Sequence, residues 1–456
     1  MRHLSARRLV PAGVIAAAGV AALMVPGAAS ASLGAQCSGS NITGQGSTLQ
    51  ELAQGIWIPG FNSSTEAHAC GGAKQPKVTY VGVGSGPGLE SWGANGKTGH
   101  FEATNAFVGT DEAPNPLQKT EIEEEETSLS KEALLTIPVL QAAVAVIVHL
   151  PEKCVATSTS NKGRLVLNNT TLEGIERGTI TKWSEITEGG DVISGTGCNS
   201  AETIKHIVRK GGSGTTHIVK KYLGLISKVP FPATNEAGVA VGNRTWDETA
   251  EGPENSTWPT ADAVIRASKG SGVVSAVAAN PSSIGYANVA DARVNAAFVP
   301  PAGGPKTSIF WVPIQNKGET SGTVTYQDPA SNKEVAGKKE SNCSKEIYTN
   351  GSEPFPPVNV QASWSEVTTK VEEPKYTLCG LTFDLALNKY SVFPIAPSLE
   401  EATTVNNYLQ FVVSTGKEKL GNKANGGQTL IKNQDYEPLV STVLKEAQKG
   451  AALAEF

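Results

Sequence analysis

The sequence predicts an α/β protein built around parallel β-sheets, because strand-like and helix-like segments alternate along most of the chain. Four strand-like segments end in turns rich in glycine and small polar residues, and three of these turns lead into a helix-like segment. Parallel sheets bind ligands at the carboxyl ends of their strands, where these turns would lie. The chain has 456 residues, which is enough for two sizeable domains.

The first residues, 1–31, have the layout of a secretory signal peptide. Basic residues precede an apolar run at 9–25, and the small-residue triplet Ala29-Ser30-Ala31 follows. We therefore expect cleavage after Ala31 and an extracytoplasmic mature protein, whether periplasmic, cell-wall associated or secreted. An uncleaved amino-terminal membrane anchor is the alternative. No later stretch of the sequence is apolar enough to span a bilayer.

Six cysteines follow the signal peptide, an even number that favours disulfides in an oxidising compartment. None belongs to a C-x-x-C pair, so a zinc site is not expected. Cys37 and Cys70 each stand a few residues before a strand-like segment, and two neighbouring parallel strands would bring them together. We therefore expect a Cys37–Cys70 bond. The same local reasoning favours Cys154–Cys198 and Cys343–Cys379.

The formal net charge of −5 argues against nucleic acid as a partner. An acidic protein can still bind an anion, because local dipoles and hydrogen bonds decide the sign of a buried site. No catalytic set is evident, since the histidines are scattered and the G-x-S-x-G motif is missing. His217 is expected to be a half-exposed helix residue.

Three strand-and-turn segments open the mature chain. Each begins with a short apolar strand, and the first two continue into apolar residues at helical spacing. Pro87 suits the first turn of the second helix. The three segments span 41–57, 77–92 and 105–116.

A fourth segment, 203–224, has the clearest pattern of strand, turn and helix. Its glycines allow several backbone N–H groups to point the same way, and together with the positive end of the helix dipole they favour an anion. Arg209 stands at the end of the strand, where its guanidinium could bind two oxygens. A turn of this kind is more often only a helix cap. On the helix, we expect Ile218 and Tyr222 on one face and Lys220 and Lys221 on the opposite, polar face.

The rest of the chain continues the alternation. The apolar run 134–150 predicts a buried strand that passes between the domains, and 165–186 predicts a strand, a helix and an exposed turn around Trp183. The stretch 300–371 is rich in Pro, Gly, Lys, Ser and Thr and predicts an elaborated loop or β insertion. The remaining predictions are a helix and a strand within 269–291, a strand at 376–387, and helices at 399–414 and 439–456.

Taken in order, the turns resemble those of one known family, the phosphate-binding proteins of bacterial phosphate ABC transporters, which have the class II periplasmic-binding-protein fold. Each short match is weak alone, and their common order over 41–291 makes the set specific. A looser match follows at 376–414. The matching segments are GQGST at 44–48, YVGVGSG at 80–86, VGTDEAP at 108–114, Arg209 with GSGTT at 212–216, GTITKW at 178–183 and NPSSIGY at 280–286.

This resemblance implies an α/β fold of two lobes joined by two crossover segments, with the ligand cleft between the lobes. Lobe 1 would comprise 32–141 plus 380–456, and lobe 2 would comprise 142–379, including the insertion at 300–371. The resemblance also implies that a monomer binds inorganic phosphate and delivers it to an ABC transporter permease. Such a protein is not an enzyme and needs no metal or cofactor.

The resemblance further implies a set of ligand contacts. Asp111 would accept the phosphate's own proton. Two positions depart from the family: Leu49 stands where an aromatic residue is common, and Gly211 stands where many members carry an aspartate that pairs with the arginine. The implied donors to phosphate oxygens are Thr48, the Leu49 N–H, Ser85, Arg209, Ser213, Gly214 and Thr215.

Three other functions stay open at this point. A receptor for sulfate or another oxyanion would use the same kind of donors. A secreted phosphatase on the same scaffold would need a metal cluster or an activated nucleophile, which the sequence does not show. A surface adhesin or signalling lectin would use the insertion at 300–371.

Overall fold

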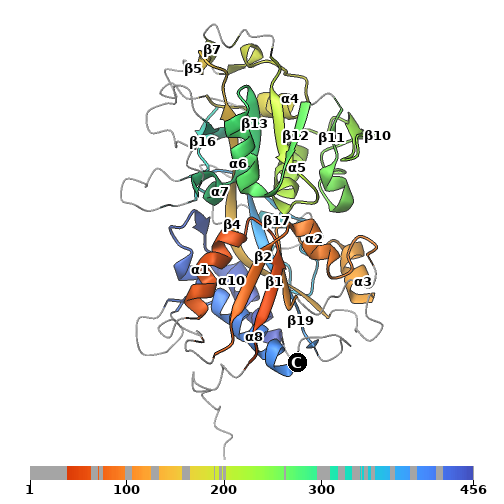
Figure 1. Ribbon diagram of the computed structural model, residues 1–456, viewed down its shortest axis with the longest axis vertical. Helices are drawn as coiled ribbons and strands as arrows, with labels where there is room; N and C mark the ends of the chain where they lie inside the picture. The colour runs from red at the N-terminus through yellow and green to blue at the C-terminus, as the bar shows by residue number, and fades with distance from the viewer. Residues whose placement is uncertain are drawn as a thin grey trace, which may run out of the picture.

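The computed structural model describes residues 39–62, 70, 75–97, 105–124, 133–156, 165–188, 191–194, 198, 202–260, 263–294, 309–316, 324–330, 339, 341–343, 348–350, 355–369, 375–390, 398–416 and 425–454. They form an elongated molecule of two stacked bodies, joined by strands that run from one body into the other (Figure 1). The predicted signal peptide at 1–31 lies outside this part of the chain. Among the described helices, none is both long and apolar enough to cross a membrane.

One long strand organises both bodies. Within the described residues, the largest sheet has ten strands, eight of them in the order β12-β8-β13-β4-β19-β3-β1-β2, and β14 and β20 also pair with β4. The first part of β4 (Leu134–His149) pairs antiparallel with β19 (Cys379–Leu387), and its last part pairs antiparallel with β13 (Ser283–Asn288). The strand is buried along nearly all of its length. This confirms the prediction of a buried strand that passes between the domains.

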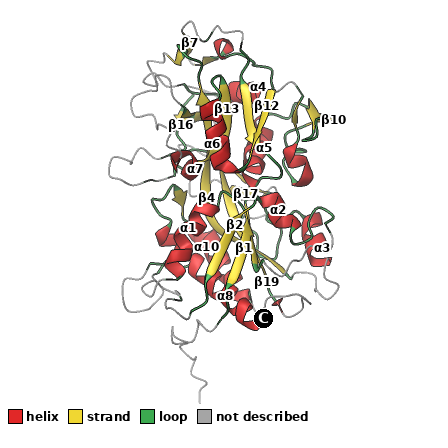
Figure 2. Ribbon diagram, viewed as in Figure 1, coloured by secondary structure: helices red, strands yellow, loops and turns green. Residues whose placement is uncertain are grey.

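The first body, lower in Figure 1, contains the three predicted strand-and-turn segments. Its strand β1 (Ile42–Gly46) lies between β2 (Val78–Gly82) and β3 (Phe107–Thr110) and is parallel to both. Helices cover this part of the sheet (Figure 2). The other elements of this body are α1 (Glu51–Phe61), α2 (Ser85–Glu90), α3 (Pro116–Glu124), α8 (Leu399–Val412), α9 (Gly427–Leu430), β20 (Tyr436–Glu437) and α10 (Ser441–Leu453).

The second body repeats this parallel arrangement. Its strand β8 (Lys205–Arg209) lies between β12 (Ala263–Ala267) and β13 and is parallel to both. Two small antiparallel sheets, β10-β9-β11 and β5-β7-β6, flank it. The remaining elements are β5 (Val155–Ala156), α4 (Asn169–Glu176), η1 (Trp183–Glu185), β6 (Thr187–Glu188), β7 (Asp191–Ser194), α5 (Gly214–Ile226), β9 (Phe231–Thr234), β10 (Ala240–Arg244), η2 (Gly252–Ser256), β11 (Trp258–Pro259), α6 (Lys269–Ala279) and α7 (Val289–Val294).

Helix α5 buries more than its predicted apolar face. Ile218 and Tyr222 are buried as expected, but Lys220 is fully buried too, so its predicted place on a polar face is wrong. The buried ammonium group lies 4.5 Å from the centre of the Trp258 ring. Its hydrogen bonds compensate the loss of water and attach a neighbouring segment to α5. It donates to the backbone carbonyl oxygens of Thr249, Asn255 and Thr257.

Two aromatic side chains are also less exposed than predicted. Trp183 is 1% exposed, and its Nε1 donates to the Ser282 hydroxyl at 3.2 Å. His217 is 7% exposed, and its Nδ1 lies 3.1 Å from the carbonyl oxygen of Ala250. Both predictions of exposure are wrong because segments far along the chain cover these side chains.

The described parts of the insertion at 300–371 contact both bodies, and β14 pairs with the last part of β4 in the second body. The Val360 carbonyl accepts the N–H of Thr136 in β4 at 2.8 Å, and Trp364 lies edge-to-face with Phe383 of β19. Its strands are β14 (Phe310–Val312), β15 (Ile314–Gln315), β16 (Tyr326–Gln327), β17 (Tyr348–Asn350) and β18 (Val367–Thr369). The predicted lobe boundaries, 32–141 plus 380–456 for lobe 1 and 142–379 for lobe 2, stay a prediction.

Two of the three predicted disulfides are present. Cys154–Cys198 and Cys343–Cys379 are bonded, with Cα atoms 4.7 Å and 6.1 Å apart. Cys37 lies outside the described residues, so the Cys37–Cys70 bond stays a prediction.

Candidate functional site

The two bodies touch where the turns after β2 and β3 face the turn after β8. Gly86 and Gly212 meet backbone to backbone, and a Cβ atom on Gly212 would lie 3.0 Å from the Gly86 Cα. A Cβ atom on Gly214 would lie 2.5 Å from the Asp111 Cβ and 2.6 Å from the Ser85 Oγ. Real side chains do not approach so closely, so only glycine permits this contact. The junction therefore brings three predicted site residues, Ser85, Asp111 and Gly214, together.

Asp111 accepts hydrogen bonds from both sides of its carboxylate. The Ser47 hydroxyl donates to its Oδ1 at 2.5 Å, and the Ser85 Oγ lies 3.5 Å from its Oδ2. Burial raises the pKa of Asp111 to about 6, while hydrogen bonds from Ser47, Thr382 and Ser85 and the charge of Arg209 oppose this shift. At neutral pH the side chain is therefore ionised and can only accept hydrogen bonds.

Arg209 is a buried cation at the end of β8, with 4% of the residue exposed. Its backbone N–H donates to the Tyr286 hydroxyl at 3.3 Å. Within the described part of the chain, its Nε has no hydrogen-bond partner. Burial lowers the pKa of Arg209, and Tyr286, Asp291 and Asp111 oppose that shift. A buried guanidinium donor without a partner costs free energy, which an anion at this place would recover.

Gly211 cannot pair with Arg209 as an aspartate at this position would, and the carboxylates near this place come from other parts of the chain. The Gly211 N–H donates to the Glu236 carboxylate at 3.1 Å. Asp291, in the first turn of α7, is buried, and its carboxylate accepts from the Asn288 side chain at 2.6 Å. Burial raises the pKa of Asp291 to about 7, and the charge of Arg209 lowers it. Asp291 is therefore partly ionised at neutral pH, and its charged form interacts with the Arg209 guanidinium.

Two predicted donors already have partners within the protein. The Ser213 hydroxyl oxygen accepts the Thr216 N–H at 3.3 Å, and the Ser213 N–H donates to Asn255 at 3.1 Å. The Leu49 N–H donates to the Ser47 hydroxyl at 3.1 Å. The turn after β8 thus caps α5, which was the alternative interpretation of that turn, whereas the Ser47 hydroxyl closes a turn that precedes α1. The hydroxyl proton of Ser213 stays available, because its oxygen accepts the capping bond.

The other predicted donors, Thr48 and Thr215, are buried as well. Two residues that contact Asp111 escaped prediction. Ser47 stands next to Thr48 in the predicted turn at 44–48, so the turn pattern itself could have revealed it. Thr382 comes from β19, and its local sequence gives no sign that it reaches Asp111.

Beneath the site, Asp384 of β19 is a fully buried carboxyl. Neither of its oxygens has a hydrogen-bond partner among the described residues, although the Gln50 side chain lies nearby. Burial raises the pKa of Asp384 to about 8, and Gln50 lowers it. At neutral pH this side chain is therefore protonated in the folded protein.

We expect Asp384→Asn to stabilise the protein at alkaline pH. The unfolded chain ionises this carboxyl near its ordinary pKa of about 3.9, whereas the folded protein keeps the proton up to a pH of about 8. Native stability is therefore lost as pH rises between these values and is constant above them. Asparagine cannot ionise, so the variant should gain several kcal/mol at about pH 8.5 and almost nothing at about pH 4.

Urea unfolding at both pH values measures this difference. Asp247→Asn is the matched control, because Asp247 forms an exposed ion pair with Lys228 at 2.6 Å. Loss of this ion pair should change the free energy of unfolding by no more than about 1 kcal/mol. An Asp384→Asn variant no more stable than the native protein at the alkaline pH would contradict the prediction.

A small cavity lies beside Asp111, between α5 and β19. Its volume open to the centres of water molecules is about 30 Å³, which is enough for ordered water. Its wall includes His217, Lys221, Trp364 and Phe383. Water can therefore lie next to the Asp111 side of the junction.

The donors and the acceptor at this junction suit a small oxyanion. They comprise the buried Arg209 guanidinium, hydroxyl groups, the turn that opens α5 and the Asp111 carboxylate as an acceptor. In the described part of the chain, no group of three or more His, Cys, Asp or Glu side chains is placed to hold a metal ion. Two α/β lobes that meet over such a site define the class of two-lobed periplasmic binding proteins.

Comparison with known proteins agrees with this class. The model of the PBP superfamily domain matches residues 31–350, so the chain belongs to the PBP superfamily. No curated protein matches the sequence.

Solved structures show the same fold. A high-affinity periplasmic phosphate-binding protein, PfluDING, bound with phosphate, is 17% identical, with a TM-score of 0.55 over 90% of this chain and 93% of that chain. A phosphate-binding protein from Stenotrophomonas maltophilia has the same identity, coverage and TM-score. A human phosphate-binding apolipoprotein is 18% identical, with a TM-score of 0.54 over 90% of this chain and 94% of that chain. At these identities the likeness concerns the fold.

Proposed function

We propose that this chain binds inorganic phosphate outside the cytoplasm and delivers it to the permease of an ABC transporter. It would act as a monomer, without catalysis, metal or cofactor. Its PBP superfamily fold and its disulfides support an extracytoplasmic place. Structures with the same fold are described as phosphate-binding proteins, one of them with phosphate bound.

The observation that carries this proposal is that a buried cation, Arg209, and a buried acceptor, Asp111, lie close enough across the junction for their charges to interact. Arg209 brings a buried guanidinium whose Nε has no partner in the described chain, and Asp111 brings a buried acceptor. An anion that still carries a proton can satisfy both groups, because it accepts from Arg209 and donates to Asp111. Phosphate at neutral pH has this property, whereas sulfate has no proton to donate. The two residues thus favour phosphate over sulfate.

Calorimetric titration of the mature protein with phosphate and with sulfate tests the proposal. We expect phosphate to bind and sulfate to give no heat of binding. Preference for sulfate would favour the alternative of a receptor for another oxyanion. If the purified protein hydrolysed phosphate esters, the alternative of a secreted phosphatase would hold instead.

The proposal includes closure of two lobes over the ligand. Thr48, Ser85 and Asp111 would lie on lobe 1, and Arg209 with the turn 213–215 on lobe 2. Phosphate would favour the closed form through contacts that exist only there. The close contact of the two bodies in this structure supports the proposal, because a closed form requires it.

A further inference from the structure

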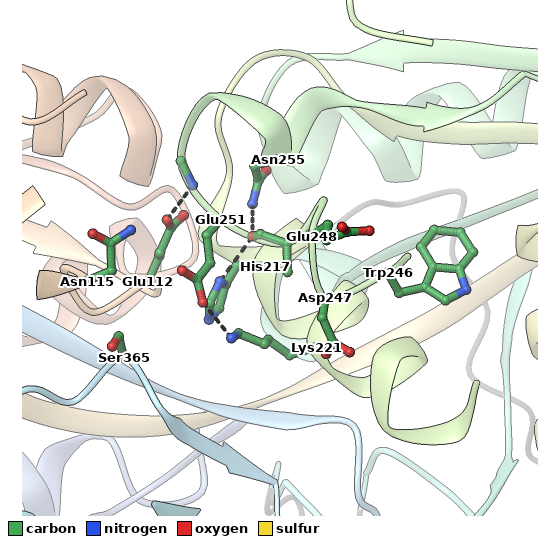
Figure 3. Close-up of polar contacts among 12 residues, drawn as sticks. Glu112, Asn115, His217, Lys221, Trp246, Asp247, Glu248, Glu251, Asn255 and Ser365 are labelled. Carbon is green, nitrogen blue, oxygen red and sulfur yellow. Dashed lines mark hydrogen bonds and ion pairs between the residues drawn. The ribbon is translucent and has the colours of Figure 1, made fainter. Parts of the chain in front are cut away.

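A second polar contact crosses the junction of the two bodies (Figure 3). Glu112 follows Asp111 in the first body and accepts the N–H of Gly252, in the second body, at 2.8 Å. Glu112 is only 2% exposed. Separation of the bodies would break this bond and return the Glu112 side chain to water. The contact therefore belongs to the closed form alone.

The segment that carries Gly252 is tied to the proposed anion site. The Lys220 ammonium attaches its two ends to α5 through backbone carbonyl oxygens. Within it, Asn255 accepts the N–H of Ser213 at 3.1 Å and donates to the Ala250 carbonyl at 2.8 Å. The partner of Glu112 and the turn that opens α5 thus move as one unit. The bond between Glu112 and the Gly252 N–H therefore forms together with the contact between the turn that opens α5 and the first body.

Charged and polar groups face Glu112 from each element packed against it. The Glu251 carboxylate precedes Gly252 and lies 2.5 Å from the Lys221 ammonium of α5. Burial raises the pKa of Glu112 to about 7, the bond from the Gly252 N–H lowers it, and the like charge of Glu251 raises it. The smaller influences come from Gln118 of α3 and from Lys221, and His217 of α5 lies beside Glu251.

We propose that closure of the lobes takes up a proton at Glu112, so that the protein binds its anion more tightly as the pH falls. A neutral carboxyl still accepts the Gly252 N–H through its carbonyl oxygen, and its burial costs far less than that of a carboxylate. In the open form, Glu112 is exposed and ionised at neutral pH. Closure must therefore either bury a charge beside Glu251 or bind a proton. The identity of the anion in this inference rests on the proposed function.

Another carboxylate that crosses the junction lacks these properties. Glu51 of α1 pairs with Lys269 of α6 at 2.9 Å, and the two side chains are 37% and 45% exposed. Water solvates this pair in the closed form, so the Glu51 carboxylate can stay ionised when the lobes close. Glu51→Gln is therefore the matched control for Glu112→Gln.

Phosphate titrations of native protein, Glu112→Gln and Glu51→Gln at two pH values test the inference. Glutamine keeps an oxygen for the Gly252 N–H and cannot ionise, so it imitates the protonated side chain. We expect Glu112→Gln to bind phosphate roughly 10²-fold more tightly than the native protein at about pH 8, and only about tenfold more tightly at about pH 5.5. Glu51→Gln should keep the native pH dependence.

Proton uptake gives a second readout. Calorimetry in buffers of different ionisation enthalpy should show up to about one proton fewer taken up per phosphate by Glu112→Gln than by the native protein at about pH 6. Protons taken up or released by phosphate and by Asp111 are the same in both proteins, so they cancel when the two values of proton uptake are subtracted. Equal pH dependence and equal proton uptake in both proteins would overturn the inference. If Glu112→Gln did not fold, Glu112→Ala would be used, which should lose affinity only at the lower pH.

Scattering of phosphate-free protein separates this inference from the proposed function. If phosphate did not bind at all, the proposed function would fail. The inference would still require the native protein to be more compact at about pH 5.5 than at about pH 8, with a smaller difference between the two pH values in Glu112→Gln, where only Asp111 and Asp291 still titrate at the junction. Native protein equally compact at both pH values would overturn it.

Discussion

Asp111→Asn is expected to reduce the preference for phosphate over sulfate by about 10²-fold. In the native protein, sulfate would place a bare oxygen against the buried carboxylate of Asp111, so two acceptors would meet without a proton. Such a clash costs about 2–5 kcal/mol, and a site built on one hydrogen bond of this kind can reject the wrong analogue by roughly 10⁴-fold. Asparagine can turn its amide NH₂ toward sulfate and remove the repulsion.

Calorimetric titrations with both anions measure the ratio of affinities. The Ser47 hydroxyl can still donate to the oxygen of an asparagine, so the turn should keep its shape. Asp247→Asn serves as the control for the same chemical change on the surface. If Asp111→Asn discriminated as sharply as the native protein, Asp111 would not be the selector.

The same carboxylate gives the selectivity a pH dependence. Because the pKa of Asp111 is raised to about 6, its side chain becomes protonated as the pH falls below that value. A protonated carboxyl can donate to sulfate. The native preference for phosphate should therefore weaken below a pH of about 6, and Asp111→Asn should show no such change.

Gly214→Ala is expected to weaken phosphate binding by roughly 10- to 10²-fold without unfolding the protein. The new Cβ atom would lie 2.5 Å from the Asp111 Cβ and 2.6 Å from the Ser85 Oγ, so the two bodies could not close to the distance seen here. Alanine is well tolerated at the start of a helix, and the fold of each body should persist. Scattering should show less compaction with phosphate than in the native protein.

Gly55→Ala is the matched control for this substitution. Gly55 lies in α1, and a Cβ atom there would meet nothing within 4 Å. We expect native affinity and a stability gain of about 0.5–1 kcal/mol in this variant. Native affinity and native compaction in Gly214→Ala would mean that the contact described here is not part of the bound state.

Local patterns in the sequence were enough to predict most of the architecture. The alternation of strands and helices, the long buried strand β4 and the Cys154–Cys198 and Cys343–Cys379 bonds are present as predicted. These features depend on hydrophobic periodicity and on segments that neighbour one another in the fold, which short stretches of sequence record. The turns at the carboxyl ends of the strands likewise identified where polar groups of both bodies meet.

Tertiary structure alone decided how the individual polar groups are used. Lys220 is buried because carbonyl oxygens of a later segment surround it, although its place in the helical pattern indicated a polar face. Thr382 reaches Asp111 from β19, and Glu112 finds its partner in Gly252 across the junction. Burial and hydrogen-bond partners of these side chains arise from contacts between segments far apart in the chain. No local pattern encodes such contacts, because the pKa and availability of a polar group depend on what the completed fold places around it.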